Sequence, residues 1–378
     1  MDRDSMRSRA AVAGVGTTHF GVIPGYTSID FGVWALREAL ADANLSGEAI
    51  DGLIVARIPD NAKFAEAAGL RPDFSLVLPP TGRMAGIAIE LACLAIASGR
   101  ARRIALVYGN DGKSAGVSYG GSNDPYGGGP LWEPYGMTSP GAFHALMYNR
   151  YMAETGADRS HLAEVAVTFR QHAGLNPAAV MRKPITAADH AAARPIAAPL
   201  HLLDYCLVND GGVAIILTDA RLARETGKAP VYVRGCRHAS DFAQSSFPPD
   251  DFWRGAMARA GAASYAEAGA KPGDMSGLMI YDNFTATVLF SLEGFGYCEP
   301  GTAWREIQDG RLRLGGRWQA NTSGGHLSES YMQGWALNAE AVRQLRGQAT
   351  GRAMRHPELI HVMTAAPQCS SIIYGVEP

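Results

Sequence analysis

One pattern constrains the fold more than any other: an alternation of apolar strand-like runs with helix-length amphipathic segments that occurs twice along the chain. The first series, in the order strand, helix, strand, helix, strand, comprises residues 10–16, 29–43, 52–58, 84–99 and 103–109. The second series keeps that order at residues 230–236, 250–268, 277–284, 331–346 and 358–367. Such alternation is typical of a layered α/β domain with a mostly parallel sheet. The repetition predicts two similar halves packed together, with a cleft where their strand ends meet.

A different pattern separates the two series. Residues 110–140 are rich in Gly, Pro, Ser and Asn and too long for a simple connection, and helical segments follow at 141–156 and 160–174. We therefore expect an inserted loop domain. The predicted boundaries are 1–115 plus 204–228 for the N-terminal half, 116–203 for the insertion and 229–378 for the C-terminal half.

Charge and hydropathy exclude several classes of protein. The 34 Lys and Arg residues nearly balance 36 Asp and Glu, for a formal net charge of -2, which gives no basic footprint for nucleic acid or for an anionic membrane. The longest apolar run, residues 86–97, contains Glu90 and is shorter than the roughly 20 residues that cross a bilayer. The N-terminal residues show no signal-peptide core. A cytoplasmic location is therefore expected, without nucleic-acid or membrane partners.

Familiar short motifs are also missing. The five cysteines form no CxxC pair or Cys/His cluster at zinc spacing, so we expect reduced, mostly buried thiols and no metal site. The sequence contains no GxSxG motif of hydrolases, no Walker motif for nucleotides, no HExxH motif of zinc proteases and no GxGxxG motif for dinucleotides. None of these functions therefore has positive support.

Three segments collect polar, aromatic and small residues after expected strands: residues 281–284 (YDNF), 321–326 (NTSGGH) and 365–369 (AAPQC). Tyr281 is a candidate site residue, although a half-buried aromatic followed by a helix N-cap at position 282 or 283 is the simpler interpretation. His326 could act as a base, although a loop histidine is more often merely solvated.

Together with VNDGGVAIIL and the NTSGG turn before a helix, this organisation resembles the thiolase superfamily, specifically its sterol-carrier/lipid-transfer branch, over nearly the whole chain. The resemblance implies a duplicated five-layer α-β-α-β-α fold with an inserted loop domain. It also implies an acyl-CoA bound under that loop domain and assembly as a dimer or tetramer.

The chain departs from the thiolase pattern at all four catalytic positions. The nucleophilic cysteine falls on Gly82, the two histidines fall on Tyr281 and Tyr331, and the last cysteine aligns with Met363. The paired tyrosines resemble the aldolase branch of thiolase-like proteins. That branch cleaves a C–C bond of β-hydroxyacyl-CoA thioesters formed in steroid side-chain breakdown, which implies a ketone and acetyl-CoA or propionyl-CoA as products.

The retro-aldol step needs an acid and a base but no acyl-enzyme and therefore no cysteine, and CoA enters only as part of the substrate. Tyr281 and Tyr331 are the expected acid/base pair, with the two roles left unassigned. Asp282 is expected to tune or orient Tyr281, and Asn283 or His326 to polarise the thioester.

The resemblance also implies partners: a small OB-fold/zinc-ribbon, acyl-CoA-associated protein, and a homodimer that could lie within a heterotetramer. Arg182 and Lys183, in the expected insertion, are candidates for binding the CoA phosphates, although surface cations are common.

Two alternatives remain open. One is a non-catalytic acyl-CoA or lipid-binding subunit. The other is a divergent thiolase or acyltransferase that uses Cys93, Cys298 or Cys369 as the nucleophile.

Overall fold

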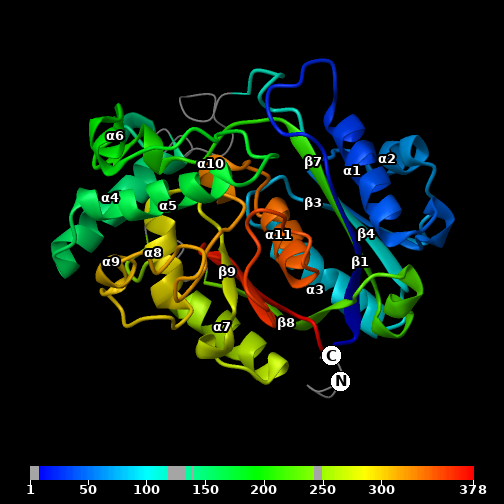
Figure 1. Ribbon diagram of the computed structural model, residues 1–378. Coiled ribbons are helices and arrows are strands. Elements are labelled where there is room, and N and C mark those ends of the chain that lie inside the picture. The colour runs from blue at the N-terminus through cyan, green and yellow to red at the C-terminus, as the bar shows by residue number, and fades with distance from the viewer. Residues whose placement is uncertain (1–7, 118–132, 138, 242–248) are drawn as a thin grey trace.

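The computed structural model describes residues 8–117, 133–137, 139–241 and 249–378 (Figure 1). Most of the Gly- and Pro-rich loop expected at 110–140 therefore lies outside the described residues.

The N-terminal half contains five strands in the order β3-β2-β4-β7-β1. Their bounds are β1 Ala10–Thr17, β2 Gly52–Ala56, β3 Phe74–Leu78, β4 Arg103–Asn110 and β7 Gly211–Asp219. Strand β2 runs parallel to β3 and β4, and β7 runs antiparallel to β4 and β1. The predicted strands at 10–16, 52–58 and 103–109 are confirmed. The sequence pattern missed β3, a short strand at the sheet edge in which buried and exposed side chains alternate only weakly.

The C-terminal half repeats this arrangement. Its strands are β8 Val231–Ser240, β9 Gly277–Ile280, β10 Leu359–Thr364 and β11 Gln368–Gly375. They lie in the order β9-β10-β11-β8 with the same relative directions as β2-β4-β7-β1, and a parallel bridge from Leu278 to Ala320 stands in place of the β2–β3 pair. The predicted duplication is thus confirmed. An antiparallel pairing of β1 with β8 joins the halves into one nine-stranded sheet.

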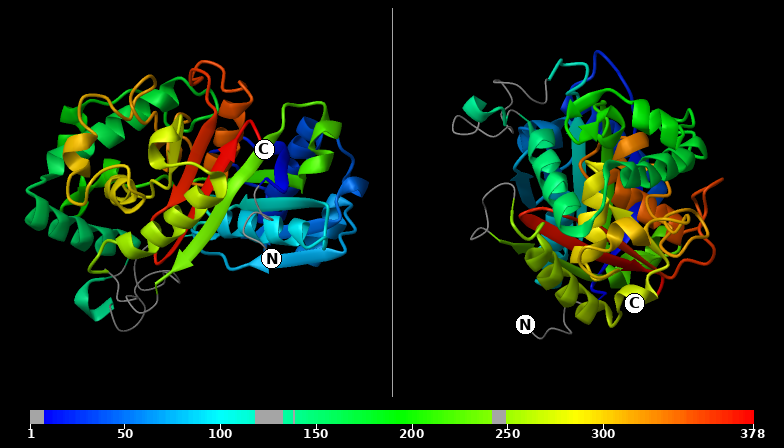
Figure 2. Two further views of the ribbon diagram at one scale, coloured as in Figure 1. Left: turned by 90° about the horizontal axis from the view of Figure 1, so that it is seen from below. Right: turned by 90° about the vertical axis from the view of Figure 1, so that its left-hand side faces the viewer.

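The strands of each half form one layer, and the helices form three further layers around and between them, so the predicted five-layer α/β fold is confirmed (Figures 1 and 2). Helix α1 (Ser28–Ala43) covers the outer face of the N-terminal strands, together with α2 (Asn61–Ala68). Helices α3 (Met84–Ala97) and α11 (Trp335–Leu345) contact strands of both halves and form the central layer. The outer layer of the C-terminal half contains α7 (Arg254–Ala268) and α8 (Thr285–Gly294).

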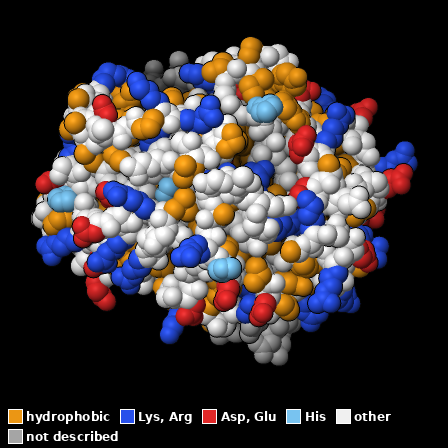
Figure 3. Space-filling view, viewed as in Figure 1, with side chains coloured by type: hydrophobic (Ala, Val, Ile, Leu, Met, Phe, Trp, Pro, Cys, Tyr) orange, Lys and Arg blue, Asp and Glu red, His pale blue; other side chains and the backbone are white. Residues whose placement is uncertain are grey.

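Helix α3 contains the longest apolar run, and its position explains that composition. A helix that packs between two sets of strands is covered on opposite sides, so it is apolar nearly all round. In the described ranges, no helix has the length and apolar character needed to span a bilayer. On the face drawn in Figure 3, cationic and anionic side chains are interspersed, in agreement with the near-zero net charge.

The segment between β4 and β7 contains the inserted helices, whereas only residues 365–367 separate β10 from β11. Helices α4 (Pro140–Thr155) and α5 (Ala163–Gly174) confirm the predictions for this region, and both pack against α8. The domain boundaries themselves stay a prediction. The other elements in the described ranges are α6 Ala187–Ala192, α9 Ala303–Glu306, α10 Gly325–Ser328, the hairpin β5 Pro195–Ala197 with β6 Leu200–His201, and 3₁₀ helices at Gly47–Ala49, Glu133–Tyr135, Arg159–Leu162, Leu202–Asp204, Ala220–Thr226 and Pro272–Asp274.

Candidate active site

Tyr281 follows the carboxyl end of β9 and is held there by a side chain that completes the sheet. The Asn321 amide accepts a hydrogen bond from the Ile280 N–H (2.6 Å) and donates one to the Ile280 carbonyl (2.8 Å). The Tyr281 N–H donates to the Met363 carbonyl of β10 at 2.9 Å. Strand β9 therefore ends at Ile280, earlier than the expected 277–284, because a side chain replaces the neighbouring backbone there.

The two tyrosines that the sequence pointed to meet in space. The Tyr331 N–H donates to Asn209 Oδ1 at 2.8 Å, which fixes the turn that precedes α11. That helix begins at Trp335, so the expected helix start at residue 331 is wrong. The Tyr281 and Tyr331 hydroxyl oxygens lie 2.9 Å apart, within hydrogen-bond distance. Residues 50 positions apart in the chain therefore form one phenol pair.

His326 packs against both phenol rings. Its ring centroid lies 4.6 Å from that of Tyr281 and 5.2 Å from that of Tyr331, edge-on to each. The side chain is fully buried, unlike a solvated loop histidine, and burial lowers the pKa of its imidazole to about 3, so the ring is neutral. Its Nε2 accepts a hydrogen bond from the Gly334 N–H at 2.9 Å. The geometry favours a positioning role, and the expected contact with a thioester stays untested.

Asp282 ties the end of β9 to the start of α10. Its carboxylate accepts hydrogen bonds from the backbone N–H groups of His326 (2.8 Å) and Leu327 (3.2 Å), and Oδ1 lies 3.3 Å from His326 Nδ1. Burial raises the pKa of Asp282 to about 8, against the lowering effect of these backbone donors. Asp282 does not cap α8, whose N-cap is Phe284 without a side-chain hydrogen bond, so the N-cap interpretation is wrong.

Asn283 is turned toward helix α8. Its Oδ1 accepts a hydrogen bond from the Thr287 hydroxyl at 2.9 Å, and its carbonyl accepts one from the Cys206 N–H at 3.0 Å. A role for its amide at the thioester stays a prediction.

The segment before α3 faces the phenol pair. A Cβ atom added at Gly82 would lie 2.4 Å from Tyr281 Oη and 3.1 Å from Tyr331 Oη. The position at which the thiolase pattern requires a nucleophile is therefore directly opposite the two hydroxyls. The neighbouring Arg83 is half-buried and interacts electrostatically with both tyrosines.

The candidate nucleophilic thiols are not activated. All five cysteines are free, and Cys93 is a core residue in the middle of α3. Burial raises the pKa of Cys298 and of Cys369 to about 12, so both thiols are protonated at neutral pH. Cys206, which sequence reasoning did not single out, interacts electrostatically with Tyr281, and burial raises the pKa of its thiol as well.

Sequence reasoning missed Arg83 and Asn209 as site residues, although Asn209 belongs to the VNDGG motif and Arg83 follows the aligned Gly82. Arg182 and Lys183 lie exposed between α5 and α6, and their role toward CoA stays a prediction.

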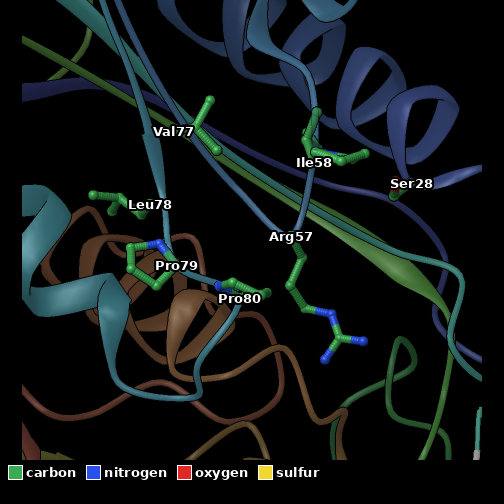
Figure 4. A pocket seen from close by; sticks show the side chains of 8 residues that line it. Ser28, Arg57, Ile58, Val77, Leu78, Pro79 and Pro80 are labelled. Atoms are coloured by element: carbon green, nitrogen blue, oxygen red, sulfur yellow. The ribbon is translucent and has the colours of Figure 1, made fainter. Parts of the chain in front are cut away.

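A cavity lies next to the residues that lead into α3 (Figure 4). Its volume is about 630 Å³, within the range of small-molecule sites. It is lined by Ser28, Arg57, Ile58, Pro59, Val77, Leu78, Pro79 and Pro80. The cavity thus combines a mostly apolar wall with one guanidinium, at the carboxyl ends of β2 and β3.

Comparison with known proteins supports the relationship. The family model described as thiolase C-terminal domain-like matches residues 239–371. A steroid side-chain-cleaving aldolase of Thermomonospora curvata is 34% identical over 97% of this chain and 98% of its own. A 17-hydroxy-3-oxo-4-pregnene-20-carboxyl-CoA lyase of Mycobacterium tuberculosis is 34% identical over 90% of this chain and 92% of its own. The solved Ltp2-ChsH2(DUF35) aldolase superposes with a TM-score of 0.90 at 31% identity and covers 98% of both chains.

Fold and site together define a thiolase-like protein that lacks the thiolase nucleophile. The chain belongs to the thiolase superfamily, within the family of thiolase-like aldolases that these relatives represent.

Proposed function

We propose that the protein is a carbon–carbon lyase that cleaves a β-hydroxyacyl-CoA thioester by a retro-aldol reaction, giving a ketone and acetyl-CoA or propionyl-CoA. The observation that carries this proposal is the 2.9 Å contact between the Tyr281 and Tyr331 hydroxyls, opposite a glycine at the nucleophile position. The relatives at 34% identity are named as an aldolase and a lyase, which supports the same reaction class.

The phenol pair provides both proton transfers. One tyrosine, as its phenolate, takes the proton of the β-hydroxyl. The electron pair of the broken O–H bond forms the C=O bond of the ketone, and the Cα–Cβ bond breaks. Its electrons pass to Cα and the thioester as an enolate, which the second tyrosine protonates at Cα. The step balances without an acyl-enzyme, so it needs neither a thiolate nor free CoA, and no cofactor is proposed beyond the CoA of the substrate.

Tyr281 is a proton donor at rest. Burial raises the pKa of its phenol above the ordinary value of about 10, against the lowering effects of the Tyr331 hydroxyl and the Arg83 charge. Tyr281 is therefore neutral before the substrate binds, and the anion that forms during cleavage must be stabilised by other groups.

The substrate class follows from the names of the relatives and from the cavity. Those names refer to steroid side chains and to a pregnene carboxyl-CoA, so we propose a bulky polycyclic acyl-CoA as the substrate. The apolar cavity before α3 has the size and lining that such a ring system requires.

The partner is proposed from the solved relative. That structure is named as an Ltp2-ChsH2(DUF35) aldolase. We propose that this chain works with a small OB-fold/zinc-ribbon protein of the DUF35 type, as a homodimer within a heterotetramer.

The test is to incubate the chain and a DUF35-type protein with a steroid β-hydroxyacyl-CoA and to follow ketone and short acyl-CoA by mass spectrometry. We expect ketone release without added CoA and without inhibition by iodoacetamide. A requirement for CoA together with thiol sensitivity would identify a divergent thiolase instead. Binding without turnover would identify a non-catalytic subunit.

A further inference from the structure

Arg83 is a half-buried cation that has no carboxylate counter-ion among the described residues. It is the residue that precedes α3, next to Gly82. Throughout the described part of the chain, the Arg83 guanidinium forms no ion pair with a carboxylate. A guanidinium keeps its positive charge in proteins, so this charge is partly removed from water without compensation.

Three other inward-facing arginines each have a partner. Arg346 pairs with Asp42 at 2.9 Å, and Arg352 pairs with Glu340 at 2.7 Å. Arg170 forms no ion pair with a carboxylate of the described residues, but it donates a hydrogen bond to the Ser328 hydroxyl at 2.9 Å. A half-buried guanidinium that lacks a carboxylate partner is stabilised by any anion that forms close to it.

The surroundings of Arg83 identify where that anion forms. Arg83 interacts electrostatically with Tyr281, Tyr331 and His144. His144 cannot share the positive charge, because burial lowers the pKa of its imidazole to about 4 and the ring is neutral at physiological pH. The groups that interact with the Arg83 charge are thus two phenols whose hydroxyls touch each other next to the neighbouring Gly82.

We propose that Arg83 is the anion-stabilising residue of this site, with a guanidinium that balances the negative charge as it moves from the phenol pair to the thioester enolate. The proposal deepens the proposed function and rests on it. When the β-hydroxyl loses its proton to a tyrosinate, the charge passes through the breaking Cα–Cβ bond to the thioester oxygen. A guanidinium has five N–H donors in a plane, so it can stay close to the charge throughout this transfer.

The experiment uses the chain together with its DUF35-type partner and compares four forms of the chain. They are wild type, Arg83→Gln, Arg83→Lys and the exposed control Arg71→Gln. Two reactions are measured. The first is ketone release from a steroid β-hydroxyacyl-CoA. The second is incorporation of deuterium from D₂O at Cα of propionyl-CoA, which reports enolate formation without any C–C cleavage.

For Arg83→Gln we expect kcat and the exchange rate to fall about 10²–10³-fold, as on removal of an oxyanion donor, with KM changed less than about threefold. The pH at which kcat is half-maximal on its acidic side should rise by about one unit, because the phenolate loses its neighbouring cation. Arg83→Lys should recover part of both rates, and Arg71→Gln should match wild type. Thermal melting of each variant checks that the fold is retained.

The outcomes separate the two proposals. If Arg83→Gln releases ketone at the wild-type rate and its pH profile is unshifted, the role of Arg83 is overturned and the lyase assignment stands. Exchange that depends on Arg83 without any ketone release would overturn the lyase assignment and support the enolate-stabilising role. Absence of both reactions in wild type would overturn both.

Discussion

The hydroxyl of Tyr281 occupies the space that a side chain at position 82 would need, because a Cβ on Gly82 would lie 2.4 Å from Tyr281 Oη. Real Cβ atoms do not approach other heavy atoms this closely. A side chain at position 82 therefore requires the Tyr281 phenol to move from the position that it has here.

Gly82→Ala tests this steric relationship. We expect about 1–3 kcal/mol of destabilisation from overpacking, together with at least a tenfold loss of kcat as the phenol is displaced. Adding Tyr281→Phe should restore part of the stability, because it removes the clashing oxygen, but not the activity.

Urea unfolding and kcat of the single and double variants measure the effect of Gly82→Ala. Gly273→Ala is the matched control, since a Cβ there meets no atom within 4 Å. If Gly82→Ala and Gly273→Ala change stability and kcat equally, the proposed clash between position 82 and the Tyr281 hydroxyl is contradicted.

Tyr281 and Tyr331 should contribute to catalysis as one unit. Tyr281→Phe and Tyr331→Phe should each lower kcat for ketone release about 10²–10⁴-fold, and the double variant should be little worse than either, because each phenol depends on its 2.9 Å partner. Binding of acyl-CoA should persist, which isothermal calorimetry can show. Tyr265→Phe is a control for the loss of a buried hydroxyl, since the Tyr265 hydroxyl donates to the Phe295 carbonyl at 3.0 Å, outside the phenol pair. Cleavage that survives in both site variants would refute their role.

Asn321 should be important for stability as well as for activity. Asn321→Ala leaves the N–H and carbonyl of Ile280 unsatisfied in a buried position, so we expect a loss of about 2–4 kcal/mol. kcat should fall too, because Tyr281 directly follows Ile280. Asn61→Ala, which removes one exposed hydrogen bond to Ser75, should cost less than about 0.5 kcal/mol in urea unfolding. If Asn321→Ala lowers the free energy of unfolding by a similarly small amount, the end of β9 keeps its structure without the Asn321 amide.

Glu329, which supports the turn between Asn321 and Tyr331, should make stability depend on pH. Its carboxylate accepts hydrogen bonds from Ser323 and Asn176, and burial raises its pKa to about 7 from the usual 4.5. Between these values the folded protein retains a proton that the unfolded chain has lost. The contribution of Glu329 to the free energy of unfolding is therefore fully present below about pH 4.5 and is lost as the pH rises through 7.

Glu329→Gln removes this titration while it keeps the shape of the side chain. At pH 8 the variant should exceed wild type by up to about 3 kcal/mol, and the difference should shrink toward pH 5. Urea unfolding across that range measures it, with the exposed Glu299→Gln as a control that should track wild type. A constant offset at all pH values would show that Glu329 is already ionised in the folded protein.

The alternation of strands and helices was readable because it is a local property. Short runs of apolar residues in the sequence mark the buried parts of β1, β2, β4, α1 and α3. The repeated order of such runs predicted the duplication. A helix was expected after position 282 or 283, but the extent of α8 was not predicted, because all ten of its residues are buried and show no amphipathic period. Strand β11 was not predicted, because residues 365–369 were interpreted as a polar site segment, whereas residues 365–367 connect β10 to β11 and residues 368 and 369 begin β11.

The sequence by itself determined the class of fold, the absence of a cysteine at the nucleophile position and the identity of the two tyrosines. Only the tertiary structure decided that these tyrosines touch and that His326 and Asp282 accept hydrogen bonds from the backbone. It also showed that Arg83 interacts with the pair and has no carboxylate partner in the part of the chain that the structure describes. The physical reason is distance along the chain. Local patterns report burial and periodicity within a few turns, whereas contacts between residues 82, 281 and 331 depend on how the two halves pack across the central helices.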